Sequence, residues 1–188
     1  MLTTTIEYAA AAAAAACARA GARRRLDAGD VLAVAGTWGP IWRLDTGALR
    51  LDRDADDGSE DAMIALPGDL VGAEMLTAMP YHYTARALVA CTLDSVGTVD
   101  EAQRQRLLAE AMLQSQRRAD DVLALRSGPA RRRVERLLAM LSGANPQLHT
   151  PPRLRLKDYA AFVGATQETT CRALAALRSN SAARCAPR

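Results

Sequence analysis

The side chains best suited to recognising a ligand lie in one C-terminal segment, from Lys157 to Leu177. Within it, Gln167 and Glu168 open a predicted helix, and Arg172 follows Glu168 by about one helical turn. In the major groove of DNA, glutamine pairs with adenine, glutamate accepts a hydrogen bond from cytosine, and arginine donates two to guanine. The three side chains therefore predict contacts with base edges. The spacing also allows an alternative, a surface ion pair between Glu168 and Arg172 worth roughly 0.3 kcal/mol.

The residues around this set predict two short helices joined by a tight turn. Gly164 stands where such a turn needs a positive φ angle, and Ala160 is small enough for two helices to cross closely. Thr166 can cap the second helix, and Glu168 complements the positive end of that helix. This arrangement is typical of a helix-turn-helix, whose second helix enters the major groove. Its predicted buried face consists of Tyr159, Val163, Ala165, Ala173 and Leu174.

The basic side chains are concentrated in the same half of the chain. Residues 1–100 contain 8 basic and 14 acidic side chains, whereas residues 101–188 contain 16 basic and 7 acidic ones. The overall net charge of +3 thus combines a net of −6 with a net of +9. A strongly positive half indicates a polyanionic partner. The predicted phosphate contacts are Arg155, Lys157, Thr166, Thr169 and Thr170, with Arg131–Arg133, Arg136 and Arg153 as further cations.

The rest of the chain supplies the elements that must position these side chains. Residues 26–97 alternate short apolar segments with glycine-containing turns, which predicts an antiparallel β-roll whose last strand covers Thr84–Thr92. Residues 98–126 predict one long helix, and residues 127–178 a helical domain that contains the helix-turn-helix. We expect residues 1–25 to form an Ala-rich helix or arm that ends in three arginines, and residues 179–188 to form a disordered tail. The predicted fold class is α+β.

Apolar and small residues on the predicted long helix recur at alternating spacings of four and three. This spacing is typical of the seam between two helices of a coiled coil, so it predicts a homodimer. Packing of the helix onto the roll of its own chain is the alternative explanation of the same stripe. The stripe consists of Leu108, Met112, Ser115, Ala119 and Val122.

Several other classes of protein are disfavoured. The sequence has no stretch of about 18 strongly apolar residues, so we expect no membrane span and a cytoplasmic location. Its four cysteines are widely spaced, which argues against a disulfide framework and against a zinc site. It contains no phosphate-binding loop, zinc-protease helix or nucleophile elbow, so we expect neither an enzyme nor a bound cofactor or metal.

The order of roll, long helix and helix-turn-helix resembles that of the cAMP receptor protein/fumarate–nitrate regulator (CRP/FNR) superfamily of bacterial transcription regulators. Pro67–Glu74 resembles the family's glycine–acid–Leu–x–Gly–x–Glu segment, Thr84–Leu88 the strand after it, and Leu156–Leu177 the DNA-recognition unit. The resemblance implies a homodimer that binds a palindromic site in double-stranded DNA, with RNA polymerase as a further partner if the protein is an activator. Gln167, Glu168 and Arg172 fall on the family's base-contacting positions.

The resemblance also implies an effector pocket in the roll. Members that bind cyclic AMP place an arginine for its phosphate just before the strand at Thr84–Leu88, where this chain has Tyr81, His82 and Tyr83. A buried phosphate without a cation would be costly, so we do not expect cyclic AMP to bind, and the effector is unidentified. The candidate pocket residues are Gly72, Glu74, Tyr83, Thr84 and Arg86.

Three departures from the family pattern, one of which is the absent phosphate arginine, support a second hypothesis. The roll spans only about 70 residues, and no strand pattern for a β-hairpin wing follows Arg178. A protein with these features could instead be a protein–protein regulatory module of the same fold. Such a module would heterodimerise with a full-length relative and would lack specific DNA binding.

Overall fold

A computed structural model describes residues 21–53, 62–143 and 154–184 of the chain. The chain divides into two compact units, with the boundary between Arg118 and Ala119. Residues 1–20 of the N-terminal helix or arm predicted over residues 1–25, and the cation Arg153, lie outside the described residues.

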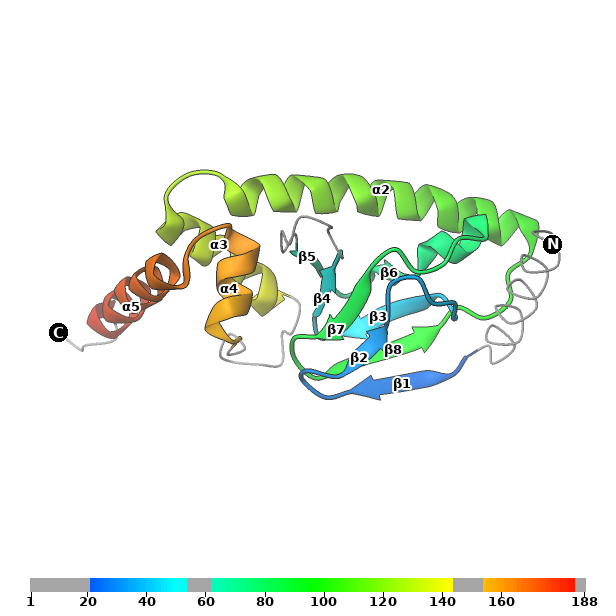
Figure 1. The fold of residues 1–188 in the computed structure, drawn as a ribbon, viewed down its shortest axis with the longest axis horizontal. Helices are drawn as coiled ribbons and strands as arrows, with labels where there is room; N and C mark the ends of the chain where they lie inside the picture. Colours follow the sequence, from blue (N-terminus) through cyan, green and yellow to red (C-terminus); the bar gives the residue numbers. More distant parts are fainter. Residues whose placement is uncertain (1–20, 54–61, 144–153, 185–188) are drawn as a thin grey trace. The chain divides into compact units, whose positions relative to one another are not determined.

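The strands of the first unit form two four-stranded antiparallel sheets, which make up a roll (Figure 1). The first sheet has the order β1-β8-β3-β6, with β1 at Arg23–Leu26, β8 at Cys91–Ser95, β3 at Trp42–Thr46 and β6 at Leu70–Val71. The second has the order β2-β7-β4-β5, with β2 at Val31–Ala33, β7 at Thr84–Ala87, β4 at Leu49–Asp52 and β5 at Ala62–Ala65. A short 3-10 helix, η1 (Ala73–Thr77), follows β6.

The core of the roll consists of inward-facing side chains from both sheets. Alternate residues of a strand point to opposite faces, so each strand contributes every second side chain. Leu44 and Leu93 from the first sheet and Leu49 and Ala85 from the second are all 0% exposed. The predicted antiparallel roll is confirmed, and so is the α+β fold class.

Gly47 shows how closely the chain approaches itself at the corners of the roll. It lies between β3 and β4 with a φ angle of +92°, and a Cβ atom there would lie 2.4 Å from the carbonyl oxygen of Ala90. Only glycine satisfies both the left-handed backbone and this contact.

The predicted strand Thr84–Thr92 is in fact two strands, β7 and β8, separated by residues 88–90. The interruption has a topological cause, because β7 pairs with β2 and β4 in one sheet whereas β8 pairs with β1 and β3 in the other. The N–H of Leu88 donates to the carbonyl of Ala48 at 2.9 Å, at the point where the chain passes between the sheets.

The three arginines expected at the end of an N-terminal helix instead form strand β1. Arg23, Arg24 and Arg25 pair in antiparallel register with Asp94, Leu93 and Thr92 of β8. Arg23 also forms an ion pair with Asp45 on the first sheet. Pairing with β8 and the ion pair with Asp45 thus hold the three arginines in a strand.

Helix α2 (Glu101–Arg126) contains the boundary between the two units. In the first unit, Leu107 joins Ile41, Leu70 and Leu76 in an apolar cluster. Gln114 is 8% exposed; its amide nitrogen donates to the carbonyl of Leu70 at 2.8 Å, and its oxygen accepts from the N–H of Leu70 at 2.6 Å. The edge strand β6 thereby gains partners for its backbone, and α2 is fixed in register on the roll.

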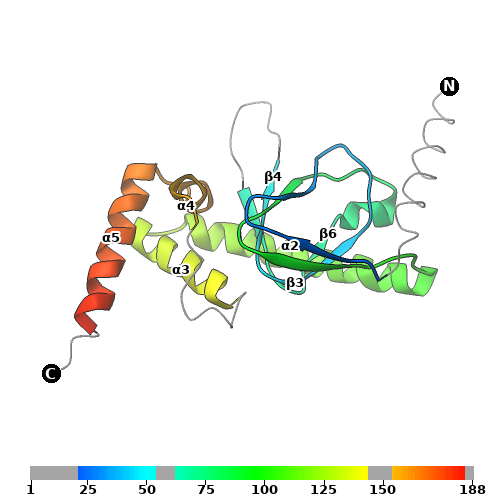
Figure 2. The ribbon, with the colours of Figure 1, turned by 90° about the horizontal axis from the view of Figure 1, so that it is seen from below.

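The second unit contains α3 (Ala130–Gly143), α4 (Leu156–Val163) and α5 (Gln167–Arg184). Figure 2 shows α4 and α5 beside α3. Val134, Leu137 and Leu141 of α3 are 0% exposed, as is Val163 of α4. None of the described helices is long and apolar enough to cross a lipid bilayer.

Helix α5 differs from the prediction at its C-terminal end. It continues to Arg184, through six residues that we expected in the tail. Ser181–Ala183 contains two alanines, the strongest helix former, so the sequence supports this extension. Residues 185–188 lie outside the described part of the chain.

Candidate functional site

The turn between α4 and α5 has the predicted geometry. Gly164 has a φ of 56° and a ψ of 49°, which lie in the left-handed region. The N–H groups of Gly164 and Ala165 both donate to the carbonyl of Ala160, the second at 3.1 Å. These hydrogen bonds end α4 and direct the chain into α5 two residues later.

Thr166 caps the N-terminus of α5, as predicted. Its Oγ1 accepts a hydrogen bond from the N–H of Thr169 at 3.2 Å. Glu168 lies in the first turn of the helix, where a negative charge is favoured by the helix dipole. The cap fixes where α5 begins and therefore which side chains lie at its exposed end.

Four side chains form the exposed N-terminal face of α5: Gln167, Glu168, Cys171 and Arg172. Arg172 and Glu168 form an ion pair across one turn, and their side chains are 72% and 76% exposed. An ion pair so accessible to water contributes little, so both groups remain free to exchange partners. Cys171 was missed by the sequence analysis, although its spacing of four from Gln167 places it on this face.

Thr170 is not available for the phosphate contact predicted for it. It is 0% exposed, and its hydroxyl donates to the carbonyl of Thr166 at 2.9 Å. Thr170 thus belongs to the core between the helices.

Two of the further arginines have structural roles in the described part of the second unit. Arg133 Nη1 donates to the carbonyls of Val163 at 2.6 Å and Gly164 at 3.2 Å, which supports the turn after α4. Arg136 Nη1 donates to the carbonyl of Ala124 at 2.6 Å, near the end of α2. One guanidinium nitrogen of each is therefore engaged by backbone carbonyls, which fixes the side chain but does not remove its charge.

The remaining predicted phosphate contacts are exposed. Arg155 precedes α4, Lys157 lies in its first turn, and Thr166 and Thr169 lie at the start of α5. These positions are at the N-terminal ends of two helices, where unpaired backbone N–H groups and the helix dipole favour an anion.

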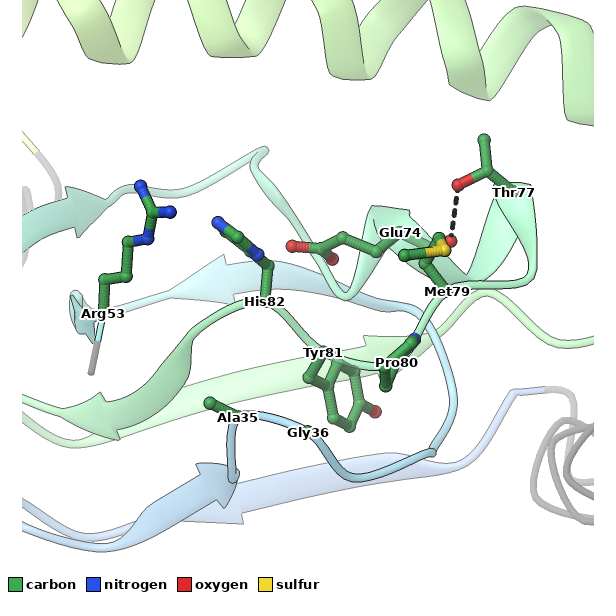
Figure 3. A pocket seen from close by; sticks show the side chains of 9 residues that line it. All are labelled: Ala35, Gly36, Arg53, Glu74, Thr77, Met79, Pro80, Tyr81 and His82. Carbon is green, nitrogen blue, oxygen red and sulfur yellow. Dashed lines mark hydrogen bonds between the residues drawn. The ribbon is translucent and has the colours of Figure 1, made fainter. Parts of the chain in front are cut away.

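A second candidate site is an open hollow of about 470 Å³ on the roll (Figure 3). Its charged and polar lining includes Arg53, Glu74 and His82, and its apolar lining includes Met79 and Tyr81. This volume lies within the range of small-molecule sites, about 300–1,000 Å³.

Of the five predicted pocket residues, Glu74 lines this hollow. Tyr83 packs against the core and meets the ring of His82 edge-on, with 4.7 Å between ring centroids. The hydroxyl of Thr84 accepts a hydrogen bond from the N–H of Ala35 at 3.1 Å. Exposed Arg86 donates to the carbonyl of Gly29 at 2.9 Å. Arg53 is the cation of the hollow that the sequence analysis missed.

Gly72, the fifth predicted residue, makes room for a tyrosine ring. Its φ angle is +82°, and a Cβ atom there would lie 2.3 Å from Cε1 of Tyr81. Tyr81 is 5% exposed, and its hydroxyl donates to the carbonyl of Pro40 at 2.6 Å. The ring of Tyr81 thus fills the space beside Gly72.

The predicted dimer stripe on α2 is largely open to solvent. Leu108 and Met112 are 36% and 66% exposed, Ser115 and Ala119 are exposed, and Val122 is half-buried. With about 100° of rotation per residue, the stripe lies roughly a quarter turn from the buried positions Leu107 and Gln114. Within the first unit, the roll therefore leaves Leu108, Met112 and Ser115 uncovered.

In the described ranges, no three His, Cys, Asp or Glu side chains gather in a way that could hold a metal ion.

Residues 23–110 match the sequence model of the cyclic nucleotide-binding domain. A search of curated protein sequences finds no match.

Solved structures of transcription regulators have the same fold. A CRP-family transcriptional regulator of Thermus thermophilus is 23% identical, with a TM-score of 0.65 over 84% of this chain and 85% of that one. FixK2 of Bradyrhizobium japonicum is 21% identical, with a TM-score of 0.62 over 86% of both chains. The c-di-GMP-responsive regulator CLP of Xanthomonas campestris is 18% identical, with a TM-score of 0.58 over 91% of this chain and 93% of that one.

The likeness to these structures concerns the fold, and the match to the domain model concerns the sequence of the roll. The resemblance inferred from the sequence is therefore confirmed at two levels: residues 23–110 match the sequence model of the cyclic nucleotide-binding domain, and the chain has the fold of solved CRP/FNR-family transcriptional regulators.

Proposed function

We propose that this protein is a sequence-specific DNA-binding transcription regulator that acts as a homodimer on a palindromic site. The observation that carries the proposal is the exposed N-terminal face of α5, where Gln167, Glu168 and Arg172 are all accessible. In a helix-turn-helix, side chains at these positions enter the major groove and meet base edges.

The surroundings of this face support binding to a phosphate backbone. Exposed Arg155, Lys157, Thr166 and Thr169 offer charged or hydroxyl donors beside it. Thr170 is left out of the contact set because it is buried. Neutralising phosphates releases counterions, so DNA affinity should fall steeply as salt is added.

The exposed stripe on α2 supports the homodimer. Met112 leaves 66% of its surface in water on a helix whose neighbouring face is already packed on the roll. A second copy of α2 would cover such a stripe through coiled-coil packing. Two α5 helices would then bind successive major grooves, about 10 bp apart from centre to centre.

The hollow on the roll is the proposed effector site, and the effector itself is unidentified. An effector regulates DNA binding only if it binds two states of the dimer with different affinities. RNA polymerase is a further partner if the regulator is an activator.

Substitution of Arg172 tests the proposal at its central contact. Arg172→Ala should lower affinity for a selected DNA site about 5- to 100-fold and relax the base preference at one position, because a bidentate guanine contact is lost. Fluorescence anisotropy with the selected site and with scrambled DNA measures both effects.

Arg106→Ala is the matched control, because it removes an exposed arginine from the part of α2 in the first unit. It should leave the affinity within about twofold. Equal affinity of Arg172→Ala and the wild type for the selected site would contradict the proposal. Binding that is indifferent to sequence in both would favour the heterodimerising module instead.

A further inference from the structure

The hollow on the roll contains charged side chains of both signs. Arg53 follows β4, Glu74 lies on η1, and His82 lies between η1 and β7. Among the described residues, no hydrogen bond or ion pair engages the guanidinium of Arg53 or the carboxylate of Glu74. Both charged groups are therefore available to a ligand that enters the hollow.

The pairing of two strands brings Arg53 toward His82. Asp52, the last residue of β4, pairs in antiparallel register with Thr84, the first residue of β7. The chain after β4 therefore runs beside the residues just before β7. The cation and the imidazole thus line the same part of the hollow.

Glu74 reaches the same space from η1. Its carbonyl accepts hydrogen bonds from the hydroxyl of Thr77 at 2.9 Å and from the N–H of Met79 at 3.1 Å, which fix its backbone. Figure 3 shows its side chain extended toward His82, with the imidazole between Glu74 and Arg53 in this view. The two opposite charges therefore face the hollow from different sides of His82.

The hollow also has an apolar wall. The ring of Tyr81 is held by its hydrogen bond to the carbonyl of Pro40 and by its close approach to Gly72. Met79 lines the hollow beside it and is 57% exposed. An unbranched thioether adapts to irregular apolar shapes, so this wall suits the hydrocarbon part of a ligand.

The two opposite charges determine which ligands the hollow favours. An anion such as a cyclic nucleotide would be attracted by Arg53 but repelled by Glu74, and a simple cation would meet the reverse. A molecule with both a carboxylate and an ammonium group pairs with both side chains. Arg53 is exposed and Glu74 is half-buried, so each ion pair alone is weak and the two together are needed.

We propose that the hollow binds a small zwitterion with an apolar side chain, its carboxylate against Arg53 and its ammonium group against Glu74. The imidazole of His82 is a further hydrogen-bonding group for either end of the ligand. Free amino acids and short peptides share this chemistry, and a volume of about 470 Å³ admits either. The regulatory meaning of the ligand rests on the proposed function, but its binding does not.

Isothermal titration calorimetry of the full chain tests the class of ligand. The probes are L-leucine, L-methionine, L-phenylalanine and the dipeptide leucyl-leucine, and at least one should bind with a dissociation constant below about 1 mM. The analogues of the tightest binder without its ammonium group or without its carboxylate should each bind at least about tenfold more weakly. For leucine these analogues are 4-methylpentanoate and 3-methylbutylamine. Tighter binding of the amino acids or of the dipeptide supports the proposal in either case and identifies the source of the zwitterion.

Two substitutions assign the ends of the ligand. Glu74→Gln should weaken binding of the zwitterion at least about fivefold without weakening the analogue that lacks the ammonium group, because a repulsion is removed. Arg53→Gln should weaken the zwitterion equally without weakening the analogue that lacks the carboxylate. A general loss of structure would weaken all ligands alike, so this crossed pattern distinguishes contact from misfolding.

Arg25→Gln is the matched control, because Arg25 is an exposed arginine of β1 that does not line the hollow. It should change each affinity by less than about twofold, since surface charges outside a site contribute little. Three outcomes would overturn the proposal: binding of none of the four probes, no effect of removing the ammonium group, and equal effects of Glu74→Gln and Arg25→Gln.

The titration uses no DNA, so its failure would leave the proposed function standing. Conversely, a failure of Arg172→Ala to weaken DNA binding would count against the proposed function and leave the zwitterion site standing.

Discussion

At the scale of single residues, the side chains on the exposed face of α5 differ in the contacts that they make before any partner binds. Glu168 and Arg172 hold each other in an exposed ion pair. Gln167 and Cys171 are exposed beside them. A partner that approaches this face must displace only a weak surface interaction.

Cys171 offers a chemical probe of this face. If α5 lies in the major groove, specific DNA should slow alkylation of Cys171 by iodoacetamide at least about tenfold. Peptide mass spectrometry measures the rate at this residue, and an equal amount of heparin is the control polyanion. An equal rate with and without DNA would show that α5 lies outside the groove.

Cys91 is an internal reference in the same experiment. Its thiol is 2% exposed, and burial raises its pKa to about 11. The reactive species is the thiolate, so Cys91 should stay unmodified at pH 8 with or without DNA. Because burial disfavours the thiolate in the folded state, this group leaves the stability unchanged below the unfolded thiol's pKa near 9 and lowers it as the pH rises from about 9 to about 11.

The residues that sequence alone misjudged are those whose partners lie far along the chain. The exposure of Gln167, Glu168 and Arg172 follows from helical spacing, so it was predictable. Thr170 is a different case, because its spacing of three from Ala173 and four from Leu174 already favours the buried face, and the structure shows Thr170 buried and Thr169 exposed. The sequence does not distinguish Arg133, which supports the turn after α4, from an arginine free to bind phosphate.

At the scale of elements, the turn between α4 and α5 depends on Gly164. Gly164→Ala should destabilise the second unit by about 1–2 kcal/mol, because a Cβ atom disfavours the left-handed conformation. The new methyl would also lie 3.4 Å from Cγ of Arg126. Thermal and urea unfolding of the full chain measure the loss.

Gly143→Ala is the matched control for this substitution. Gly143 is the last residue of α3, has no positive φ and has nothing within 4 Å of an added Cβ atom. Alanine there should be neutral or stabilising by up to about 1 kcal/mol, because it favours a helix. A loss of stability equal to that of Gly164→Ala would contradict the role assigned to the turn.

The dimer stripe on α2 can be tested against an equally exposed neighbour. Met112→Glu should raise the dimer dissociation constant at least about tenfold, because it places a charge in a coiled-coil seam. Sedimentation equilibrium measures this constant. Leu113→Glu should change it by less than about twofold, since Leu113 is 67% exposed but lies about 100° away around the helix.

Equal effects of the two substitutions would contradict the assignment of the seam. A wild-type protein that is monomeric at every concentration tested would contradict the homodimer itself.

The helices and strands were predictable where residues that end an element, such as glycine, lie next to it in the sequence. Glycine-bounded strands such as β3 and β4, and the glycine that ends α4, have signals within a few residues. The break between β7 and β8 has no such signal, because Leu88, Val89 and Ala90 continue the apolar pattern. Their separation follows from the need to pair in two different sheets, which is a property of the whole roll.

At the scale of the whole molecule, the division of charge follows the division of the fold. The acidic first hundred residues include all the described strands of the roll, and the basic remainder includes the exposed face of α5. The boundary of the two compact units falls within α2, which also carries the proposed dimer stripe. Along the chain, α2 therefore runs from the unit with the proposed effector hollow to the unit with the proposed DNA contact.

Selection of binding sites from a random pool of double-stranded DNA is the most direct test of sequence-specific binding by a homodimer. With the purified full chain at several salt concentrations, we predict enrichment of an inverted repeat whose half-sites lie about 10 bp apart or a multiple of that distance. The logarithm of the binding constant should fall linearly with the logarithm of the salt concentration. Recovery of no common sequence, with affinity that depends on salt but not on sequence, would contradict this account.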